Sequence, residues 1–219
     1  MPAKYLHGEK IEKAATALIL IDVINDFDFP EASELLKQAI PAAHCIRKLK
    51  AQAKAAGMPV IYANDNFGRW RSDFTRLVKH CLAPESRGRP VAELLKPEAD
   101  DYFVLKPKHS GFYCTALEIL LDDLGVRTVI LTGFATNICV LFTANDAYLR
   151  DLTVIVPRDC VGANTVSEND AALSQIRRIL KANTHLHSKL DLKKLSCHGQ
   201  KIPRRRKPGG SHGASSKPR

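Results

Sequence analysis

The sequence lacks a long hydrophobic run, a signal peptide and closely spaced cysteines. No apolar segment reaches the roughly 18 residues that a membrane-spanning helix needs, so we expect no membrane anchor. The N-terminal Met-Pro-Ala-Lys has no basic segment followed by an apolar one, as a signal peptide would. The six cysteines include no Cys-x-x-Cys pair, and 219 residues are enough to form a core without disulfides. We therefore expect a cytoplasmic protein with reduced thiols.

The excess of positive charge lies almost entirely in the C-terminal segment. The formal net charge is +10, but residues 189–219 hold ten Lys or Arg side chains and one acid, Asp191. Residues 1–188 therefore carry a net charge of only +1. A nearly neutral body argues against a nucleic-acid-binding protein, apart from weak contacts of the tail. A non-enzymatic binder of anionic polymers, using Arg204–Lys207, is the alternative from another functional class.

Short apolar stretches rich in β-branched residues alternate with helical stretches along the body. The spacing predicts strands at 17–21, 59–63, 102–105, 128–132 and 153–156, and helices at 31–56, 73–80, 115–124, 137–150 and 167–181. Nearly continuous apolar strands separated by helices indicate a parallel sheet covered on both faces. The predicted fold is a three-layer α/β/α domain over residues 1–188. Residues 189–219, rich in Pro, Gly, Ser and charge, are expected to form a disordered basic tail.

Three residues with reactive side chains follow predicted strands. Asp22 and Lys106 each come directly after a strand, and Cys139 begins the helix that follows the fourth strand. Because ligands of a parallel sheet bind beyond the carboxyl ends of its strands, we expect these side chains at one edge. The helix N-terminus and Lys106 would lower the pKa of the Cys139 thiol. Asp22 would accept the thiol proton and return it.

Each of these residues also has a purely structural interpretation. An aspartate after a strand commonly forms a turn, and a single cysteine in apolar surroundings is commonly a small core residue. A lysine is commonly solvated. Position alone does not separate Lys106 from Lys108, although Pro107 is expected to end the strand.

Three segments resemble the signature blocks of the isochorismatase-like cysteine hydrolase superfamily, in the same order and spacing. They are residues 17–27 (Ala-Leu-Ile-Leu-Ile-Asp-Val-Ile-Asn-Asp-Phe), 106–112 (Lys-Pro-Lys-His-Ser-Gly-Phe) and 132–140 (Thr-Gly-Phe-Ala-Thr-Asn-Ile-Cys-Val), the last extended by Thr-Ala-Asn-Asp-Ala at 143–147. The likeness covers about residues 14–185. It implies a six-stranded, mainly parallel sheet of Rossmann-like type and frequent assembly into homo-oligomers.

The resemblance also implies roles for individual residues. Asp22, Lys106 and Cys139 would form a catalytic triad. The lysine of the family motif stands four residues before the serine of Ser-Gly-Phe, which selects the first of the two candidate lysines. The backbone N–H groups of Ala135 and Cys139 would form an oxyanion hole, arranged by a cis peptide bond between Phe134 and Ala135.

Departures from the family's patterns bear on cofactors and subfamily. Nicotinamidases of this superfamily hold a metal through Asp and His side chains in the loop after the second strand, whereas residues 64–70 here contain no histidine. We therefore expect no metal and no other cofactor. His185 and His187 share a face if their segment is extended, but we expect them to be incidental. Members that cleave isochorismate generally lack the nucleophilic cysteine, so Cys139 argues against that activity.

Candidate substrate-binding residues come from the loop after the second strand and from the motifs. They are Asn66, Phe67, Trp70 and Arg71 in the loop, and Phe27 and Phe112 in the motifs. Packing of the loop or of the core is the alternative role for the aromatic residues. The cysteines at positions 45, 81, 114 and 160 are interpreted as structural.

The sequence as a whole predicts a cysteine-dependent hydrolase. Its substrate would be a small molecule with an amide or related C–N bond, cleaved through a thioester acyl-enzyme on Cys139. The alternative enzyme is an isochorismate-type vinyl-ether hydrolase, which would release pyruvate and tolerate the loss of that cysteine.

Overall fold

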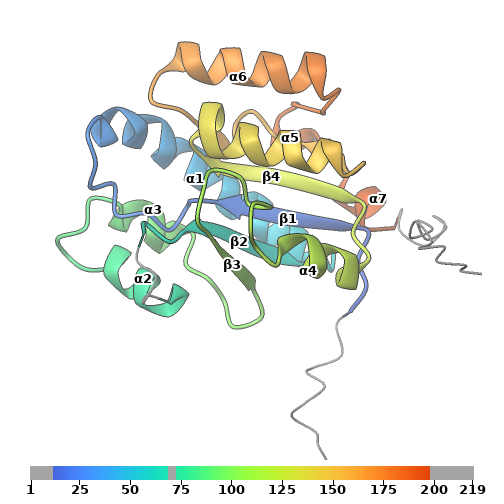
Figure 1. Cartoon of the computed structure of the whole chain (residues 1–219), viewed down its shortest axis with the longest axis horizontal. Helices are drawn as coiled ribbons and strands as arrows, with labels where there is room; N and C mark the ends of the chain where they lie inside the picture. Colours follow the sequence, from blue (N-terminus) through green and yellow to red (C-terminus); the bar gives the residue numbers. More distant parts are fainter. Residues whose placement is uncertain (1–11, 69–72, 198–219) are drawn as a thin grey trace, which may run out of the picture.

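The computed structural model describes residues 12–68 and 73–197. They form a six-stranded parallel sheet in the order β3-β2-β1-β4-β5, with β6 paired to the end of β4 (Figure 1). The strands are β1 (Thr16–Ile21), β2 (Val60–Asp65), β3 (Tyr102–Lys106), β4 (Thr128–Phe134), β5 (Thr153–Ile155) and β6 (Val161–Gly162). The predicted three-layer α/β/α fold with a six-stranded sheet is confirmed.

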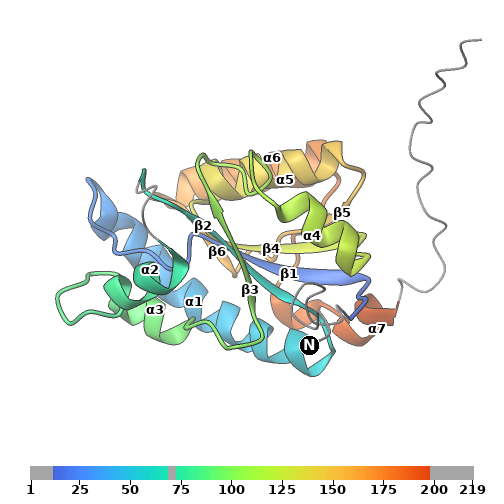
Figure 2. The same ribbon diagram turned by 60° about the horizontal axis from the view of Figure 1, so that its bottom comes forward.

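Helices cover both faces of this sheet. They are α1 (Ala32–Ala55), α2 (Phe74–Cys81), α3 (Arg89–Leu94), α4 (Leu117–Leu124), the π-helical turn η1 (Thr136–Val140), α5 (Leu141–Leu149), α6 (Val166–Ile179), the 3-10 turn η2 (His187–Lys189) and α7 (Leu192–Cys197). Figure 2 shows α1 on one side of the sheet and α5 and α6 on the other. Within the two described ranges, no helix is both long and apolar enough to cross a membrane.

The central strand β1 is apolar throughout because both of its faces are covered. Leu18 and Leu20 belong to the hydrophobic cluster under α1, whereas Ile19 and Ile21 belong to the cluster under α4, α5 and α6. All six residues of β1 are buried. Strand connections diverge between β1 and β4, since β2 lies on one side of β1 and β4 on the other. Ligands of open parallel sheets bind beyond the carboxyl ends of the strands at such a point.

Helix α6 begins with a capping box, in which side chain and backbone groups satisfy each other's hydrogen bonds. The hydroxyl of Thr165 accepts the Glu168 N–H, and the Glu168 carboxylate accepts the Thr165 N–H. Helix α6 therefore starts at Val166, one residue before the predicted position, because the residue that caps it is a threonine outside the apolar pattern.

The C-terminal part of the described chain is folded onto the domain, which moves the predicted boundary at residue 189. Leu192 of α7 is 8% exposed and belongs to the cluster under α1. The Thr16 hydroxyl donates a 2.8 Å hydrogen bond to the Leu195 carbonyl oxygen. The boundary was placed too early because the Leu residues of this short segment show no long periodicity. The rest of the predicted tail, residues 198–219, lies outside the described residues.

Candidate active site

The three residues predicted as a triad meet beyond the carboxyl ends of the strands. Asp22 directly follows β1, Lys106 ends β3, and Cys139 lies in η1 after β4. The Lys106 Nζ atom lies 2.8 Å from Oδ2 of Asp22 and donates a 3.5 Å hydrogen bond to the Cys139 sulfur. The Lys106 ammonium therefore contacts both the Asp22 carboxylate and the Cys139 sulfur.

The backbone angle of Asp22 and a hydrogen bond from β2 fix the orientation of its carboxylate. Asp22 has a φ of 51°, in the left-handed region that Asp tolerates better than most residues. Its own N–H donates to the Ala63 carbonyl, 3.0 Å away, and its Oδ1 accepts the Asp65 N–H at 2.7 Å. Oδ1 is thus fixed to β2, and Oδ2 is left for Lys106.

A close approach of β4 to β1 brings the cysteine turn beside Asp22. At Gly133, with a φ of 111°, a Cβ atom would lie 2.0 Å from the Ile21 carbonyl oxygen, so only glycine fits. The peptide bond between Phe134 and Ala135, one residue after this glycine, is cis, as the resemblance implied. The turn η1 follows directly and carries Cys139. The assignment of the Ala135 and Cys139 N–H groups to an oxyanion hole stays a prediction.

The triad is almost completely removed from solvent, with 0%, 6% and 9% exposure for Lys106, Asp22 and Cys139. A buried ammonium needs anionic partners, and Lys106 also lies 3.7 Å from Oδ2 of Asp65. Burial alone would lower the Lys106 pKa, but the charges of Asp22 and Cys139 outweigh burial and raise it. Lys106 is therefore the permanent cation of the site.

Burial and charge keep the proton on the thiol in the unliganded site. Burial raises the pKa of Cys139, the negative charge of Asp22 raises it further, and Lys106 opposes both only in part. Burial likewise raises the pKa of Asp22, against the attraction of Lys106. The thiol pKa is therefore raised and not lowered as expected, because the sequence shows neither the burial of the thiol nor the negative charge of Asp22 acting on it.

Hydrogen bonds connect the lysine loop to the helix that follows the cysteine. The Thr143 hydroxyl donates to the Cys139 carbonyl at 2.7 Å and accepts the Gly111 N–H at 3.0 Å. The Ser110 hydroxyl donates to the Asp146 carboxylate at 2.5 Å. These contacts join residues of the second and third motifs, so the two motifs that resemble the family also hold the lysine loop against the cysteine helix.

One residue near the sulfur was missed by the sequence analysis. The Nδ1 atom of His109 lies 4.0 Å from the Cys139 sulfur, and its ring packs against Phe142 at a centroid distance of 5.4 Å. His109 is exposed, in contrast to the triad. Its place in the same motif as Lys106, three residues further on, was the available signal.

A cavity of about 210 Å³ lies next to the residues that follow β2, and no member of the triad lines it. It is lined by Asp26, Asp65, Asn66, Phe67, Asp73, Arg76, Leu77, His80 and Leu105. Asp65 links the cavity to the triad, since its carboxylate also lies near Lys106. Asn66 and Phe67, predicted as substrate-binding residues, therefore lie in the wall of this cavity.

The two phenylalanines predicted to bind substrate lie in the core instead. Phe27 is fully buried in the cluster under α1, with its ring against Phe29 and Phe134, so it has no surface to offer a substrate. Phe112 is 4% exposed, and the Arg150 guanidinium lies 4.7 Å from its ring centroid. Both phenylalanines are core residues. Trp70 and Arg71 lie outside the described residues.

The described part of the loop after β2 has no histidine. This loop is described up to Gly68. His80, the only histidine among the cavity residues, comes from α2 and pairs with Asp26 at 2.9 Å. Over residues 12–68 and 73–197, three possible ligand atoms converge only at Cys45, Asp159 and His187, which include no triad member.

Comparisons with known proteins agree with the fold and the motifs. A family profile described as the Isochorismatase domain matches residues 16–186. The chain is 41% identical over 172 residues to the isochorismatase family protein YaaI of Bacillus subtilis, covering 78% of this chain and 94% of YaaI. It is 30% identical over 192 residues to the ureidoacrylate amidohydrolase RutB of Methylobacterium radiotolerans, covering 76% and 74% of the two chains.

A solved structure extends the same likeness to three dimensions. N-carbamoylsarcosine amidase from Thermoplasma acidophilum matches with a TM-score of 0.62 and 28% identity, over 81% of this chain and 99% of that chain. The family profile covers well over half of the present chain. The chain therefore belongs to the isochorismatase-like hydrolase superfamily, and it is a hydrolase.

Proposed function

We propose that this hydrolase cleaves an amide or ureido C–N bond of a small molecule, with Cys139 as the nucleophile. The observation that carries the proposal is the buried Lys106 ammonium, which lies 3.5 Å from the Cys139 sulfur and 2.8 Å from the Asp22 carboxylate and so holds a nucleophile and a base at one site. An adjacent base is what activates a weak nucleophile. Two similar proteins, a ureidoacrylate amidohydrolase and an N-carbamoylsarcosine amidase, are named for this class of reaction.

In the first half of the reaction, the enzyme is acylated. Asp22 removes the thiol proton as the Cys139 sulfur attacks the substrate carbonyl carbon. Because the thiol pKa is raised, a free thiolate does not form first, and the proton leaves the sulfur together with formation of the C–S bond. The carbonyl oxygen gains negative charge, which the N–H groups of Ala135 and Cys139 stabilise. The C–N bond then breaks, and Asp22 gives its proton to the departing nitrogen. A thioester on Cys139 remains.

In the second half, water releases the product. Asp22, again ionised, accepts a proton from water as the water oxygen attacks the thioester carbonyl. The C–S bond breaks, and the proton on Asp22 returns to the sulfur. Lys106 stays protonated throughout and offsets the negative charge that moves between Asp22 and Cys139.

The cavity that Asp65 connects to Lys106 supports a small substrate. Its volume of about 210 Å³ lies below the range of about 300–1,000 Å³ common for drug-sized ligands. Asn66 offers an amide group and Phe67 an apolar ring in the wall of the cavity. The residues at 69–72 add to this loop in the sequence, and the proposed roles of Trp70 and Arg71 rest on that position.

The proposal is tested with a panel of small amides, ureas and carbamates, read by release of ammonia or amine. We expect at least one to be hydrolysed by the wild-type chain and by Cys114→Ser, which changes an exposed cysteine, but not by Cys139→Ala. Hydrolysis that is unaffected in Cys139→Ala would contradict the proposal. Release of pyruvate from isochorismate by that variant would favour the vinyl-ether alternative instead.

Homo-oligomeric assembly is a separate prediction, and light scattering of the purified protein tests it.

A further inference from the structure

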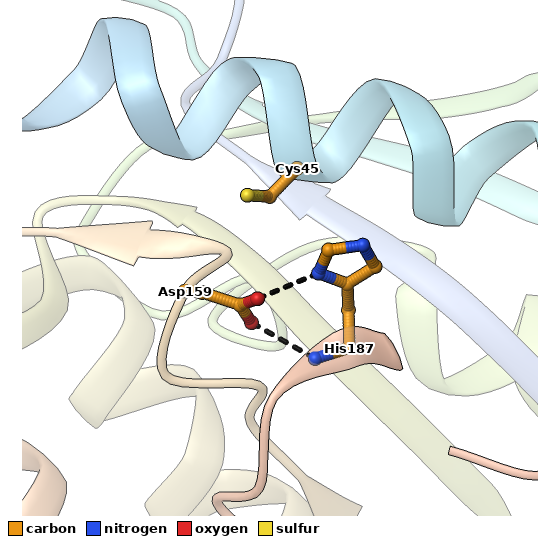
Figure 3. Close-up of side chains that lie close together, drawn as sticks. All are labelled: Cys45, Asp159 and His187. Carbon is orange, nitrogen blue, oxygen red and sulfur yellow. Dashed lines mark hydrogen bonds and ion pairs between the residues drawn. The ribbon is translucent and has the colours of Figure 1, made fainter. Parts of the chain in front are cut away.

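Three side chains with metal-ligand chemistry converge away from the triad, from three separate segments. Cys45 belongs to α1, Asp159 to the connection between β5 and β6, and His187 begins η2. One possible ligand atom from each lies within 4.8 Å of the others. Figure 3 shows the Cys45 thiol on the helix, facing the space above the Asp159 carboxylate and beside the His187 ring. This convergence is not expected from the sequence, which indicates a structural role for Cys45 and none for His187.

The Asp159 and His187 side chains are already held in place. Asp159 Oδ1 accepts the backbone N–H of His187 at 2.9 Å, while Oδ2 lies 2.6 Å from the ring Nδ1. The Cys160 thiol also lies near Oδ1, at 3.8 Å. These two side chains are mostly buried, with 23% exposure for Asp159 and 12% for His187. Oδ1 of Asp159 thus accepts hydrogen bonds from within the protein, whereas Oδ2 of Asp159 and Nδ1 of His187 lie on the side of Cys45.

We propose that Cys45, Asp159 and His187 bind a zinc ion. Thiolate sulfur, imidazole nitrogen and carboxylate oxygen are the three protein donors that Zn²⁺ accepts in tetrahedral sites. The donor atoms of a tetrahedral zinc site lie about 3.5 Å apart. The possible ligand atoms of Cys45, Asp159 and His187 lie within 4.8 Å of one another, so shifts of about 1 Å would bring them to this spacing. With thiolate and carboxylate, the three ligands carry two negative charges, which the ion neutralises.

Binding exchanges protons for the metal. The Cys45 thiol loses its proton to solvent, and the sulfur forms the Zn–S bond. Nδ1 of His187 binds through its lone pair, so any proton shared with Asp159 leaves, and Nε2 carries the ring proton of the neutral imidazole. Oδ2 of Asp159 turns from Nδ1 to the ion, while Oδ1 keeps its hydrogen bond to the backbone and orients the carboxylate.

A route to the site and its fourth ligand are also available. A cavity of about 320 Å³ borders His187 and is lined further by residues of α1 and of the segment 188–193. Of the three proposed ligands only His187 lines this cavity, and a water that enters beside His187 would complete the tetrahedron. Because the ligands come from α1, the β5–β6 connection and η2, the ion cross-links the C-terminal segment to the body. We assign it a structural role, separate from the triad chemistry.

The binding test uses tag-free full-length protein, stripped with a chelator and titrated with Zn²⁺ against a chromophoric competitor. We expect one tight site per chain, with affinity reduced about tenfold or more in Cys45→Ser and in His187→Gln. Matched controls are Cys114→Ser and His185→Gln, which change an exposed cysteine and an exposed histidine. Wild-type affinity in both ligand variants, or no tight site in the wild-type chain, would overturn the proposal.

Co²⁺ replaces zinc for a second measurement that identifies the sulfur ligand. Cobalt bound to a thiolate absorbs in the near ultraviolet, and we expect this band in the wild-type chain, in Cys139→Ala and in Cys197→Ser. It should vanish in Cys45→Ser, and in Asp159→Asn the affinity for Co²⁺ should fall. A band that vanishes in Cys139→Ala and persists in Cys45→Ser would place the metal at the triad and overturn the proposal, even if one variant proved unstable. Zinc should also raise the Tm of the wild-type chain but not of Cys45→Ser.

Discussion

The Lys106 ammonium lies 2.8 Å from the Asp22 carboxylate, and these side chains are 0% and 8% exposed. Removing one partner of such a buried pair leaves the other charge without compensation, at a cost of about 3–5 kcal/mol. The pair is therefore a structural requirement as well as a catalytic arrangement. Substitutions that keep the size and shape of the side chain, such as Asp22→Asn, therefore test the catalytic role of the pair with the least effect on folding.

Asp22→Asn should separate thiol reactivity from catalysis. The Asp22 charge raises the pKa of Cys139, so its removal should increase the thiolate fraction and speed alkylation of Cys139 by iodoacetamide at alkaline pH. Turnover should nevertheless be lost, because no base is left to pass the proton to the leaving nitrogen. Peptide mass spectrometry gives the alkylation rate of Cys139. Asp122→Asn on α4, which changes an exposed aspartate, is the control and should alter neither the alkylation rate of Cys139 nor turnover. Slower alkylation of Cys139 in Asp22→Asn would contradict the account.

The acid side of the pH profile should report Asp22. Burial raises its pKa above the ordinary value of 3.8, and the protonated carboxyl cannot accept the thiol proton. We therefore expect kcat/KM to fall as the pH decreases, with a midpoint above 3.8. For stability the sign is opposite: the folded protein holds this proton more tightly than the unfolded chain, so the contribution of Asp22 is full at low pH and is lost as the pH rises through its folded pKa. Full activity down to pH 3.8 in a protein that remains folded would refute the assignment of Asp22 as the base.

His109 should affect turnover more than folding. Its Nδ1 lies 4.0 Å from the Cys139 sulfur, whereas the side chain is exposed and contributes little to the core. We expect His109→Gln to lower kcat/KM by about tenfold or more with a nearly unchanged Tm. His185→Gln serves as the control at another exposed histidine. Unchanged kinetics in His109→Gln would show that its nearness to the sulfur has no catalytic consequence.

Two truncations should differ in stability. Removal of residues 190–219 deletes α7 with the buried Leu192 and the partner of Thr16, and burial of one Leu contributes about 1.5–3 kcal/mol. Removal of residues 198–219 spares α7, and we expect it to leave Tm and kinetics unchanged while weakening retention on heparin. Chemical denaturation of the two truncated chains gives the comparison. Equal stabilities would show that α7 does not contribute.

The fold and the triad were accessible from the sequence because each depends on local patterns. Buried parallel strands are apolar throughout, and the residue after each strand lies at the shared edge, which brought Asp22, Lys106 and Cys139 together in the prediction. The structure also separates the two candidate lysines, since Lys106 is fully buried in the site and Lys108 is exposed.

Other features could not be predicted because they depend on packing between distant segments. The raised pKa of Cys139 follows from its burial against Asp22, and no pattern of residue types reports burial of a polar site. Cys45, Asp159 and His187 are far apart along the chain and converge because α1, the β5–β6 connection and η2 come together in the fold. Phe27, a motif residue, proved to belong to the core.

The covalent step at Cys139 is tested most directly by intact-protein mass spectrometry of acid-quenched turnover mixtures with a responsive amide. We predict a mass increase equal to the acyl part of the substrate, located by peptide mapping to Cys139 and absent in Cys139→Ala. The adduct should decay at a rate that is at least as fast as kcat. A Cys139→Ala protein that turns over the same amide at the wild-type rate would contradict the account.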